Sequence, residues 1–442
     1  MANSEQPNIL YILADDMGWG DVSFHGSDIR TPVVDRLAAT GVELDHHYVC
    51  PVCTPTRTCL MTGRHPGRFG KHATTPTIYP VLPDGYETIA GSLRNAGYET
   101  GLFGKWHLGS SLEYAANNWG FDTSYGCQAG CMDPYTHRYW RPGYEHTWHR
   151  DGKPVDEPGH STDLIVRTAM DWLESRDGSK PWFCYVPFTA VHEPVKAPQD
   201  WLAKYAYETY DEDPVRDRSF KMYAAYASHM DWAIGQLLEL LERHDLSKDT
   251  LVIFTSDNGA IEGCNSNKKW PGWYEETPRL GTNVPLRGRK GQLYEGGIRT
   301  PTVAYWPGKL SARKVEEPVH VVDWMPTFAK LAGYKPDGNP RWDGIDIWPL
   351  LSGEGDQEAR RCIYWNLRNQ RFALFHETWK LIQEEEKGEQ KLQLFDIRSD
   401  PYEKKDLVAE QPDVVKKLQG MIAAEREHDG ASKRADVDED AH

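Results

Sequence analysis

The 442-residue chain has few cysteines, an excess of acidic over basic side chains, and no long apolar run. Eight cysteines are too few for a disulfide-stapled fold, and their spacing does not match a structural zinc site. The formal charge of −16 disfavours a nucleic-acid partner, because binding phosphates requires clustered Lys and Arg. Because no run of 18 apolar residues is present, we expect no transmembrane helix and no membrane partner.

The amino terminus, MANSEQPNIL, lacks the basic region and apolar core of a signal peptide. We therefore expect a cytoplasmic protein, or a periplasmic or extracellular one whose export signal is not part of this chain. Hydrophobic residues make up 39% of the sequence, and with 38 glycines this composition is typical of a globular protein. The sequence leaves open whether Cys127 and Cys131 form a disulfide.

Four short apolar runs end in acids, lysine or histidine. Near-continuous runs of this length are typical of buried parallel strands, and helical patterns lie between them. This alternation predicts an α/β fold, a mostly parallel sheet between helices. Ligands of such sheets bind beyond the carboxyl ends of the strands. The predicted strands are Ile9–Ala14, Gly101–Phe103, Trp182–Phe188 and Leu251–Thr255, and the helices are 32–40, 87–96, 163–175 and 218–243, the last as one helix or two.

The sequence changes character near residue 335. Lys335–Gly355 is rich in Gly, Pro and Asp, which predicts a connector. Beyond it, Arg371–Gln383 and Lys391–Ile397 resemble antiparallel strands, and Pro412–Glu427 has helical periodicity. We therefore predict a catalytic domain over residues 1–340 and a small α+β subdomain with an antiparallel sheet over residues 341–442.

The segment CTPTRTCLMTGR, from Cys53 to Arg64, is the most informative part of the chain. Pro55 suits the first turn of a helix, which would place Cys53 at the helix N-terminus and Arg57 one turn later on the same face. A helix N-terminus beside a guanidinium group makes a good anion site. The alternative is a buried cysteine that simply packs within a helix.

This segment resembles the signature of the type I sulfatases of the alkaline phosphatase superfamily, Cys-x-Pro-Ser/Thr/Ala-Arg followed by Leu-x-Thr-Gly. In that family the cysteine is oxidised to formylglycine, whose hydrated aldehyde is the nucleophile that attacks a sulfate monoester. One departure is Thr56, which stands where serine is commonest. The resemblance implies an alkaline-phosphatase-like core and, as a partner, a formylglycine-generating or anaerobic sulfatase-maturating enzyme. It covers residues 8–20, 53–63, 97–109, 256–259, 291–301 and 394–406.

The resemblance implies a metal site formed by the modified Cys53 and two residue pairs, Asp15 with Asp16 and Asp257 with Asn258. Carboxylate and amide oxygens favour a hard cation, so Ca²⁺ is expected, with Mg²⁺ as the alternative. The alternative is that the two pairs are unrelated and only cap turns or helices. That would not explain why both pairs follow apolar strands.

The resemblance also implies roles for three residues around the nucleophile. Arg57 would hold the modified Cys53 and help to balance charge around the metal. Lys105 would bridge the nucleophile and a sulfate oxygen, and His107 would remove a proton from the sulfated hydrate so that the aldehyde re-forms and sulfate leaves. By itself Lys-x-His is a weak motif, and both side chains could lie in a solvated loop.

His192 matches the family's histidine that contacts the leaving oxygen of the sulfate ester. Lys290 matches the family's second sulfate-binding lysine. Together they could stabilise the departing alkoxide. Arg287 and Arg289 lie close to Lys290 in sequence, so a basic surface loop is the alternative for this segment.

Two stretches rich in aromatic and basic residues, 135–149 and 264–281, could form the rim of the pocket. Aromatic faces with polar edges suit sugar rings, so we expect a sulfated carbohydrate as the substrate, with exo action as the habit of the family. The alternative is that these aromatic residues only pack the long loops against the rest of the protein. The candidate substrate-binding residues are His137, Trp140, His149, Trp270 and Trp273.

Two other functions stay open at this point. A phosphate or phosphonate monoester hydrolase of the same superfamily would use the same metal and nucleophile. A non-catalytic binder of sulfated glycans would keep the pocket but leave Cys53 unmodified.

Overall fold

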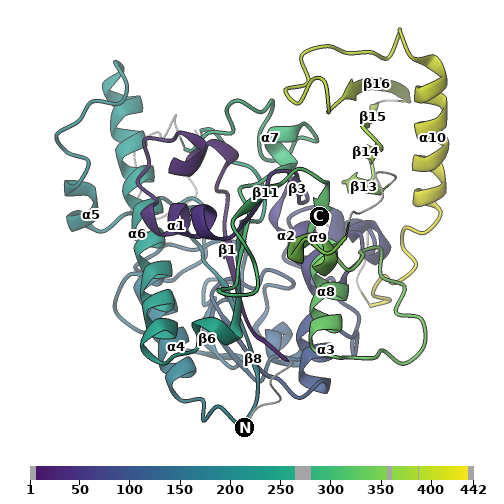
Figure 1. Ribbon diagram of the computed structural model, residues 1–442. Coiled ribbons are helices and arrows are strands. Elements are labelled where there is room, and N and C mark those ends of the chain that lie inside the picture. The colour runs from purple at the N-terminus through teal and green to yellow at the C-terminus, as the bar shows by residue number, and fades with distance from the viewer. Residues whose placement is uncertain (1–5, 264–279, 356–360, 387, 437–442) are drawn as a thin grey trace.

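The computed structural model describes residues 6–263, 280–355, 361–386 and 388–436. In this part of the chain a ten-stranded, mostly parallel sheet lies between two layers of helices (Figure 1). A separate four-stranded antiparallel sheet near the carboxyl terminus is covered by one helix. The predicted fold class, an α/β core with a small antiparallel sheet after it, is confirmed.

The large sheet has the strand order β11-β2-β10-β9-β1-β8-β4-β5-β6-β7, and β1 pairs in parallel with both β8 and β9. All four predicted strands are present, each within two residues of its expected ends. β3 (His47–Tyr48) and β12 (Val319–His320) form a small sheet of their own. The strands of the large sheet are β1 (Asn8–Ala14), β2 (Val42–Leu44), β4 (Glu99–Phe103), β5 (Thr123–Cys127), β6 (Trp148–Arg150), β7 (Lys153–Pro154), β8 (Trp182–Pro187), β9 (Thr250–Ser256), β10 (Val303–Tyr305) and β11 (Arg313–Val315).

The helices of the main body lie on the two sides of this sheet, with α1, α4 and α6 on one side and α2, α3 and α8 on the other (Figure 1). The long helix α6 is continuous, and Asp213 caps its start by accepting from the backbone N–H groups of Val215 and Arg216. The helices are α1 (Pro32–Thr40), α2 (Cys53–Thr62), α3 (Ile89–Asn95), α4 (Ser161–Glu174), α5 (Gln199–Ala203), α6 (Pro214–Arg243), α7 (Glu295–Ile298), α8 (Trp324–Leu331), α9 (Trp348–Ser352) and α10 (Pro412–Arg426).

The central strands are buried on both faces. In β1, alternate side chains enter different apolar clusters: Ile9 and Tyr11 pack on the α2 side, and Leu10 and Ile12 pack on the α6 side. This alternation follows from the two-residue repeat of a strand. It explains why β1 is a continuous apolar run, and it leaves only the strand ends free for polar side chains.

The carboxyl-terminal sheet differs from the prediction in detail. The segment Arg371–Gln383, expected as one strand, is divided between β14 (Arg371–His376) and β15 (Trp379–Glu386). Glu377 has a φ of 61° at the turn between them, and no Gly or Pro marks that turn in the sequence. β13 (Cys362–Leu367) was not predicted, and β16 (Glu389–Asp396) follows β15. The connector predicted over Lys335–Gly355 contains the short helix α9. The domain boundary at residue 340 stays a prediction.

A buried ion cluster joins this sheet to the main body. The Nζ atom of Lys380, on β15, lies 2.8 Å from Glu295 Oε1 and 2.8 Å from Glu403 Oε1, and all three side chains are fully buried. Glu403 Oε2 also accepts from the backbone N–H of Glu295 at 2.8 Å. Because Glu295 is the first residue of α7, the cluster ties the carboxyl-terminal sheet to the start of α7.

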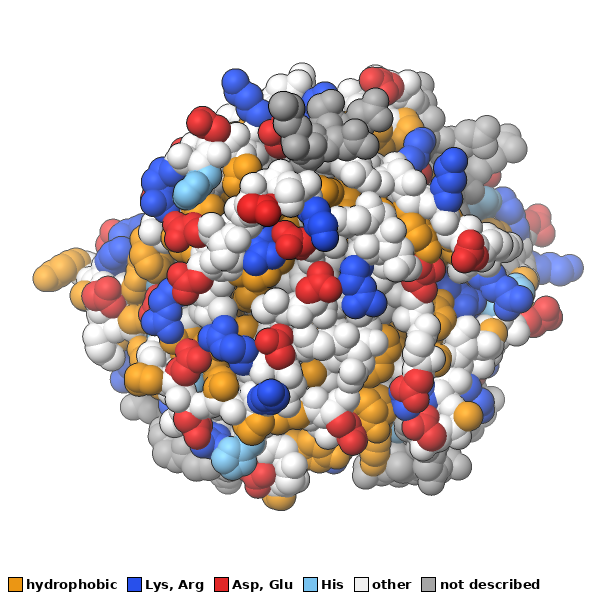
Figure 2. All heavy atoms as spheres, turned by 90° about the horizontal axis from the view of Figure 1, so that it is seen from below, with side chains coloured by type: hydrophobic (Ala, Val, Ile, Leu, Met, Phe, Trp, Pro, Cys, Tyr) orange, Lys and Arg blue, Asp and Glu red, His pale blue; other side chains and the backbone are white. Residues whose placement is uncertain are grey.

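Within the described ranges, no helix is long and apolar enough to cross a membrane. Cys127 and Cys131 are both free thiols. Figure 2 shows the lower face of Figure 1, where acidic and basic side chains are mixed and no basic patch forms.

We predict that Lys380→Met lowers the free energy of unfolding by about 3–5 kcal/mol, because it removes the cation nearest to two buried carboxylates. Urea-induced unfolding of the variant and the parent measures the difference. Lys405→Met is the matched control, since the ion pair of Lys405 with Glu410 is exposed to solvent and its removal should leave the midpoint almost unchanged. Equal effects of the two substitutions would contradict the prediction.

Candidate active site

The two acidic pairs meet at one edge of the sheet. β1 and β9 are paired in register up to their last residues, so Asp15 and Asp16 emerge beside Asp257 and Asn258. The backbone N–H of Asp16 donates to Asp257 Oδ1 at 3.2 Å, and Asn258 Nδ2 donates to Asp16 Oδ1 at 2.7 Å. All four side chains are buried. Strand pairing thus brings together residues that lie more than 240 positions apart in sequence.

Each of the three carboxylates has a cation of its own, and each cation comes from a different segment. Three positive charges therefore balance three negative charges, and a further anion in this site requires a further cation. The pairs are Lys105 Nζ with Asp15 Oδ2 at 2.7 Å, Arg57 Nη2 with Asp257 Oδ2 at 2.9 Å, and Lys290 Nζ with Asp16 Oδ2 at 2.7 Å.

Burial and the neighbouring cations act in opposite directions on the carboxylates. Burial alone would raise the pKa of Asp16, but Lys290 and His192 hold that pKa well below its usual range. Burial raises the pKa of Asp15, and Lys105 only partly opposes it because Asp257 adds to the increase. In addition, Asp15 Oδ1 and Asn258 Oδ1 are buried acceptor oxygens that lack a hydrogen-bond donor among the described residues.

Cys53 is the first residue of α2, as the position of Pro55 predicts. Its side chain is buried, and burial raises the pKa of its thiol. Arg57 lies one turn later, also buried, and its Nη1 donates to the backbone carbonyl of Lys105 at 2.7 Å. The helix N-terminus and the guanidinium group therefore lie in the same buried region, as expected for an anion site.

Thr56 contributes a contact that sequence reasoning missed. Its Oγ1 donates to the backbone carbonyl of Asp257 at 2.6 Å and accepts from the backbone N–H of Cys50 at 2.9 Å. The hydroxyl thus ties the segment before Cys53 to the end of β9. The one sequence signal for it was the hydroxyl residue inside the cysteine motif.

His107 follows β4 in a left-handed conformation, with a φ of 59°. Its ring is buried, and its Nε2 lies 3.4 Å from Thr54 Oγ1. Burial, followed by the charges of Lys105 and Arg57, holds the pKa of His107 well below its usual value. The ring also passes close to Gly130, where an added Cβ would lie 2.5 Å from Nε2. Gly130 is therefore a second residue that the sequence analysis did not identify.

His192 follows β8 and lies beside Asp16. Its Nδ1 donates to the carbonyl of Glu193 at 2.5 Å, which leaves Nε2 facing Asp16 Oδ2 at 3.6 Å. Burial and Lys290 lower the pKa of His192 to about 4. The ring is therefore neutral near pH 7, although a carboxylate lies beside it.

The five candidate substrate-binding residues do not all lie where a ligand could reach them. His137 is largely buried and stacks on Trp148, and Trp140 is partly exposed. His149 is fully buried on β6, so its side chain is not accessible in this structure. Trp270 and Trp273 lie outside the described residues.

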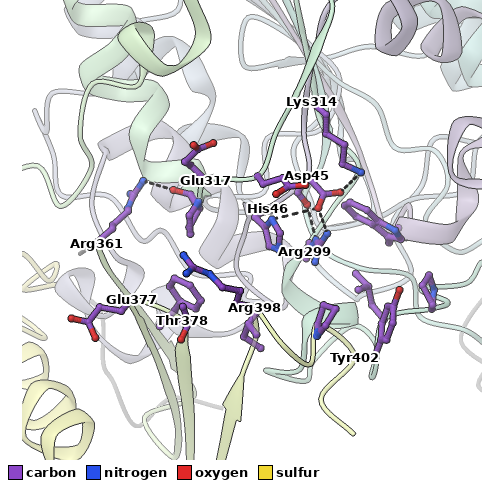
Figure 3. A pocket seen from close by; sticks show the side chains of 18 of the residues that line it. Asp45, His46, Arg299, Lys314, Glu317, Arg361, Glu377, Thr378, Arg398 and Tyr402 are labelled. Atoms are coloured by element: carbon purple, nitrogen blue, oxygen red, sulfur yellow. Dashed lines mark hydrogen bonds and ion pairs between the residues drawn. The ribbon is translucent and has the colours of Figure 1, made fainter. Parts of the chain in front are cut away.

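A cavity of about 720 Å³ lies between the large sheet and the carboxyl-terminal sheet (Figure 3). Its charged side chains are largely paired within the protein: Asp45 contacts Arg299 at 2.7 Å and Lys314 at 2.6 Å, and Arg361 pairs with Asp323. None of the residues around the acids of β1 and β9 lines this cavity. It is therefore separate from the candidate active site.

Two family models match the chain. The one described as Sulfatase covers residues 7–334, and the one described as N-sulphoglucosamine sulphohydrolase, C-terminal, covers residues 289–428. The chain belongs to the sulfatase family. This sulfatase is therefore a sulfuric ester hydrolase, and its family membership points to a metal ion and a formylglycine residue.

Similar proteins agree with the family match. The sulfatase is 32% identical to arylsulfatase J of Mus musculus, over 94% of this chain and 75% of the relative. It is 32% identical to N-acetylgalactosamine-6-sulfatase of Canis lupus familiaris, over 82% of this chain and 69% of the relative. The crystal structure of Ps i-CgsB in complex with k-i-k-neocarrahexaose matches 98% of this chain and 95% of its own, with a TM-score of 0.83 and 28% identity.

We predict that Thr56→Val lowers the free energy of unfolding by about 1–3 kcal/mol, because it leaves a buried carbonyl and a buried N–H without their partner. Thr56→Ser is the matched control, since it keeps the hydroxyl and should change stability by less than about 1 kcal/mol. Denaturant unfolding of both variants measures the effect. A serine variant as unstable as the valine variant would show that the methyl group, and not the hydroxyl, matters here.

Proposed function

We propose that this sulfatase hydrolyses a sulfate monoester on a sulfated saccharide, with formylglycine made from Cys53 as the nucleophile. The observation that carries the proposal is the single buried cluster in which the start of α2 meets the acids of β1 and β9 and their three cations. This arrangement suits an anion, because cations from three segments gather at one place.

We further propose Asp15, Asp16, Asp257, Asn258 and the modified Cys53 as ligands of Ca²⁺. The donor set consists of oxygen atoms, and Asp15 Oδ1 and Asn258 Oδ1 are buried without a donor, which fits a hard cation. Such a cation would supply the extra positive charge that a bound sulfate requires, and would stabilise the charge that develops during hydrolysis.

The buried environment of Cys53 supports its conversion to formylglycine. Burial raises the pKa of its thiol, so the unmodified side chain is a poor thiolate nucleophile near neutral pH. A hydrated formylglycine would instead supply two hydroxyl groups on one carbon. Conversion requires a formylglycine-generating or anaerobic sulfatase-maturating enzyme, which we propose as a partner.

The remaining roles follow from charge and protonation. Lys105 and Lys290 are the ammonium groups that would bind sulfate oxygens, while Arg57 pairs with Asp257 and ties the start of α2 to the end of β9. His107 is neutral and buried, so it can accept a proton. His192, also neutral, has its Nε2 3.6 Å from Asp16 Oδ2, where it could contact the leaving oxygen.

A saccharide substrate is supported by the names of similar proteins, one an N-acetylgalactosamine-6-sulfatase and another bound to an oligosaccharide. His137 and Trp140 remain candidates for sugar contacts in this proposal. We also keep the division into residues 1–340 and 341–442, which the separate carboxyl-terminal sheet supports.

We predict that kcat/KM for a chromogenic sulfate ester exceeds that for the phosphate ester of the same alcohol by at least about 100-fold. The site offers charge suited to a monoanionic ester, and a phosphate monoester carries more negative charge near pH 7. Steady-state kinetics on the two esters measures the ratio, and a preference for phosphate would overturn the sulfatase proposal for this site.

The assay needs a control that shows whether Cys53 has been modified in the protein used. Conversion to formylglycine makes the tryptic peptide Leu37–Arg57 roughly 18 Da lighter, and fragmentation should place the change at Cys53 and not at Cys50. Cys53→Ala, prepared in parallel, should reduce activity at least about 1,000-fold. Full activity in protein that contains only unmodified cysteine would exclude formylglycine as the nucleophile.

We predict that Ca²⁺ stabilises the metal-free protein, by about 2.7 kcal/mol at 100 times its Kd, because binding to the folded state alone shifts the unfolding equilibrium. Thermal unfolding after chelation and re-addition of Ca²⁺, Mg²⁺ or Zn²⁺ measures this effect without an activity assay. Asp257→Asn should weaken the response, whereas Asp413→Asn, an exposed acid on α10, should retain it. Stabilisation by Zn²⁺ but not by Ca²⁺ would contradict the proposed metal.

A further inference from the structure

A hollow of about 350 Å³ lies where α5 meets α4 and α6, away from the catalytic cluster. Figure 1 shows α5 beside α6 at the outer edge of the molecule. The active-site acids, lysines and His107 do not contribute to its lining. The lining residues are Asp163, Pro198, Asp200, Trp201, Lys204, His229 and Trp232.

The hollow is built on aromatic rings. The ring centroids of Trp201 and Trp232 are 6.1 Å apart at an interplanar angle of 49°. His229 stacks on one face of Trp232, with centroids 5.7 Å apart, while 40% of Trp232 remains exposed to solvent. An exposed tryptophan held in place by packed rings is a surface suited to the apolar face of a ligand.

The rim of the hollow is polar and carries more acid than base. Asp163 accepts from His229 Nε2 at 2.7 Å, yet 47% of its side chain is exposed. Asp200 is exposed at the start of α5, and the Nζ of Lys204 lies 3.2 Å from the ring centroid of Trp201. Two carboxylates and one ammonium group therefore surround the rings, so the rim can accept several hydroxyl hydrogen bonds but disfavours an anion.

A metal ion is a poorer occupant, although His160, Asp163 and His229 have side-chain atoms close to one another. Both ring nitrogens of His160 already have partners. Its Nδ1 accepts from the backbone N–H of Thr162 at 3.1 Å, and its Nε2 lies 2.9 Å from the carbonyl of Lys196. Binding a metal through His160 would break one of these bonds.

We propose that this hollow is a second saccharide-binding site that takes an unsulfated sugar unit of the polymeric substrate or product. The C–H face of a sugar ring would lie against Trp232, and its hydroxyl groups would donate to Asp163 and Asp200. The acidic rim disfavours sulfated units, whereas the catalytic centre, together with its proposed metal ion, would bind them. This inference rests on the proposed function, because it assumes a saccharide substrate.

The hollow is also connected to the catalytic segment. His160 packs between the rings of His229, at 4.8 Å, and Tyr135, at 5.0 Å, and 44% of Tyr135 is exposed. The carbonyl that His160 contacts belongs to Lys196, four residues after His192. A polymer held at the hollow would therefore be bound beside the segment that carries His192.

The test is affinity electrophoresis of the full chain in gels that contain chemically desulfated carrageenan, compared with its sulfated parent. We expect the desulfated polymer to retard the protein more strongly than its parent. Trp232→Ala should weaken this retardation at least about tenfold in apparent Kd. Tyr207→Ala, which removes an aromatic ring that is 98% exposed and outside the hollow, is the matched control and should leave retardation unchanged.

Asp200→Ala gives a second, exposed substitution in case Trp232→Ala fails to fold, and it should also weaken retardation. All three variants should retain the parent's kcat/KM on a small chromogenic sulfate ester, because none of these residues belongs to the catalytic cluster. Three results would overturn the second site: no retardation by the desulfated polymer, equal retardation of all variants, or no competition by desulfated oligosaccharides. If the small ester is hydrolysed but the polymers do not bind, only the second site fails; if polymers bind but no sulfate ester is hydrolysed, the proposed function fails.

Discussion

The parallel pairing of β1 with β9 is the constraint on which the rest of the site depends. It places Asp15, Asp16 and Asp257 in one buried volume, where unpaired carboxylates would be strongly destabilising. The main body can bury this edge of the sheet only if cationic side chains pack against the acids. Lys105 comes from the end of β4 and Arg57 from the first turns of α2, so forming the sheet and docking α2 neutralise two of the three acids.

The third cation links the catalytic cluster to the carboxyl-terminal sheet. Lys290 lies in a segment without regular structure, which cannot hold a buried ammonium group in place by itself. That segment runs into α7, whose first residue, Glu295, is bonded to Lys380 and Glu403. In addition, Arg371 on β14 donates to the carbonyl of Gly291 at 3.2 Å. A second buried ion cluster therefore supports the first, which gives the small sheet a role in the geometry of the site.

The sequence predicted the parts of this structure that depend on local pattern. The apolar runs identified β1, β4, β8 and β9, and Pro55 located the start of α2, because these signals arise from burial and backbone geometry within a few residues. Contacts between distant segments were not predictable in the same way. Thr56 bonds to a carbonyl 201 residues away, and nothing in its local pattern indicates that partner.

The predictions that were wrong, and the residues that were missed, also depend on features that the local sequence pattern does not show. The turn at Glu377 lacks Gly and Pro, so two strands were expected as one, and Lys380 was not recognised as a core residue because lysine is rarely buried without a partner. His149 was grouped with potential sugar contacts because it lies in an aromatic-rich stretch, but strand pairing in β6 buries it. Composition identifies a stretch that could bind a sugar, but the sheet decides which of its side chains reach solvent.

The buried cations help to explain why Asp16 and the two histidines differ in protonation. Lys290 holds the pKa of Asp16 low, so this acid stays ionised in spite of its burial. Burial, together with the same positive charges, lowers the pKa values of His107 and His192, so these rings stay neutral. A site that must hold an anion, keep Asp16 charged and still offer an uncharged base needs these conditions together. Buried cations achieve this because their effect on each neighbour is strong where water is excluded.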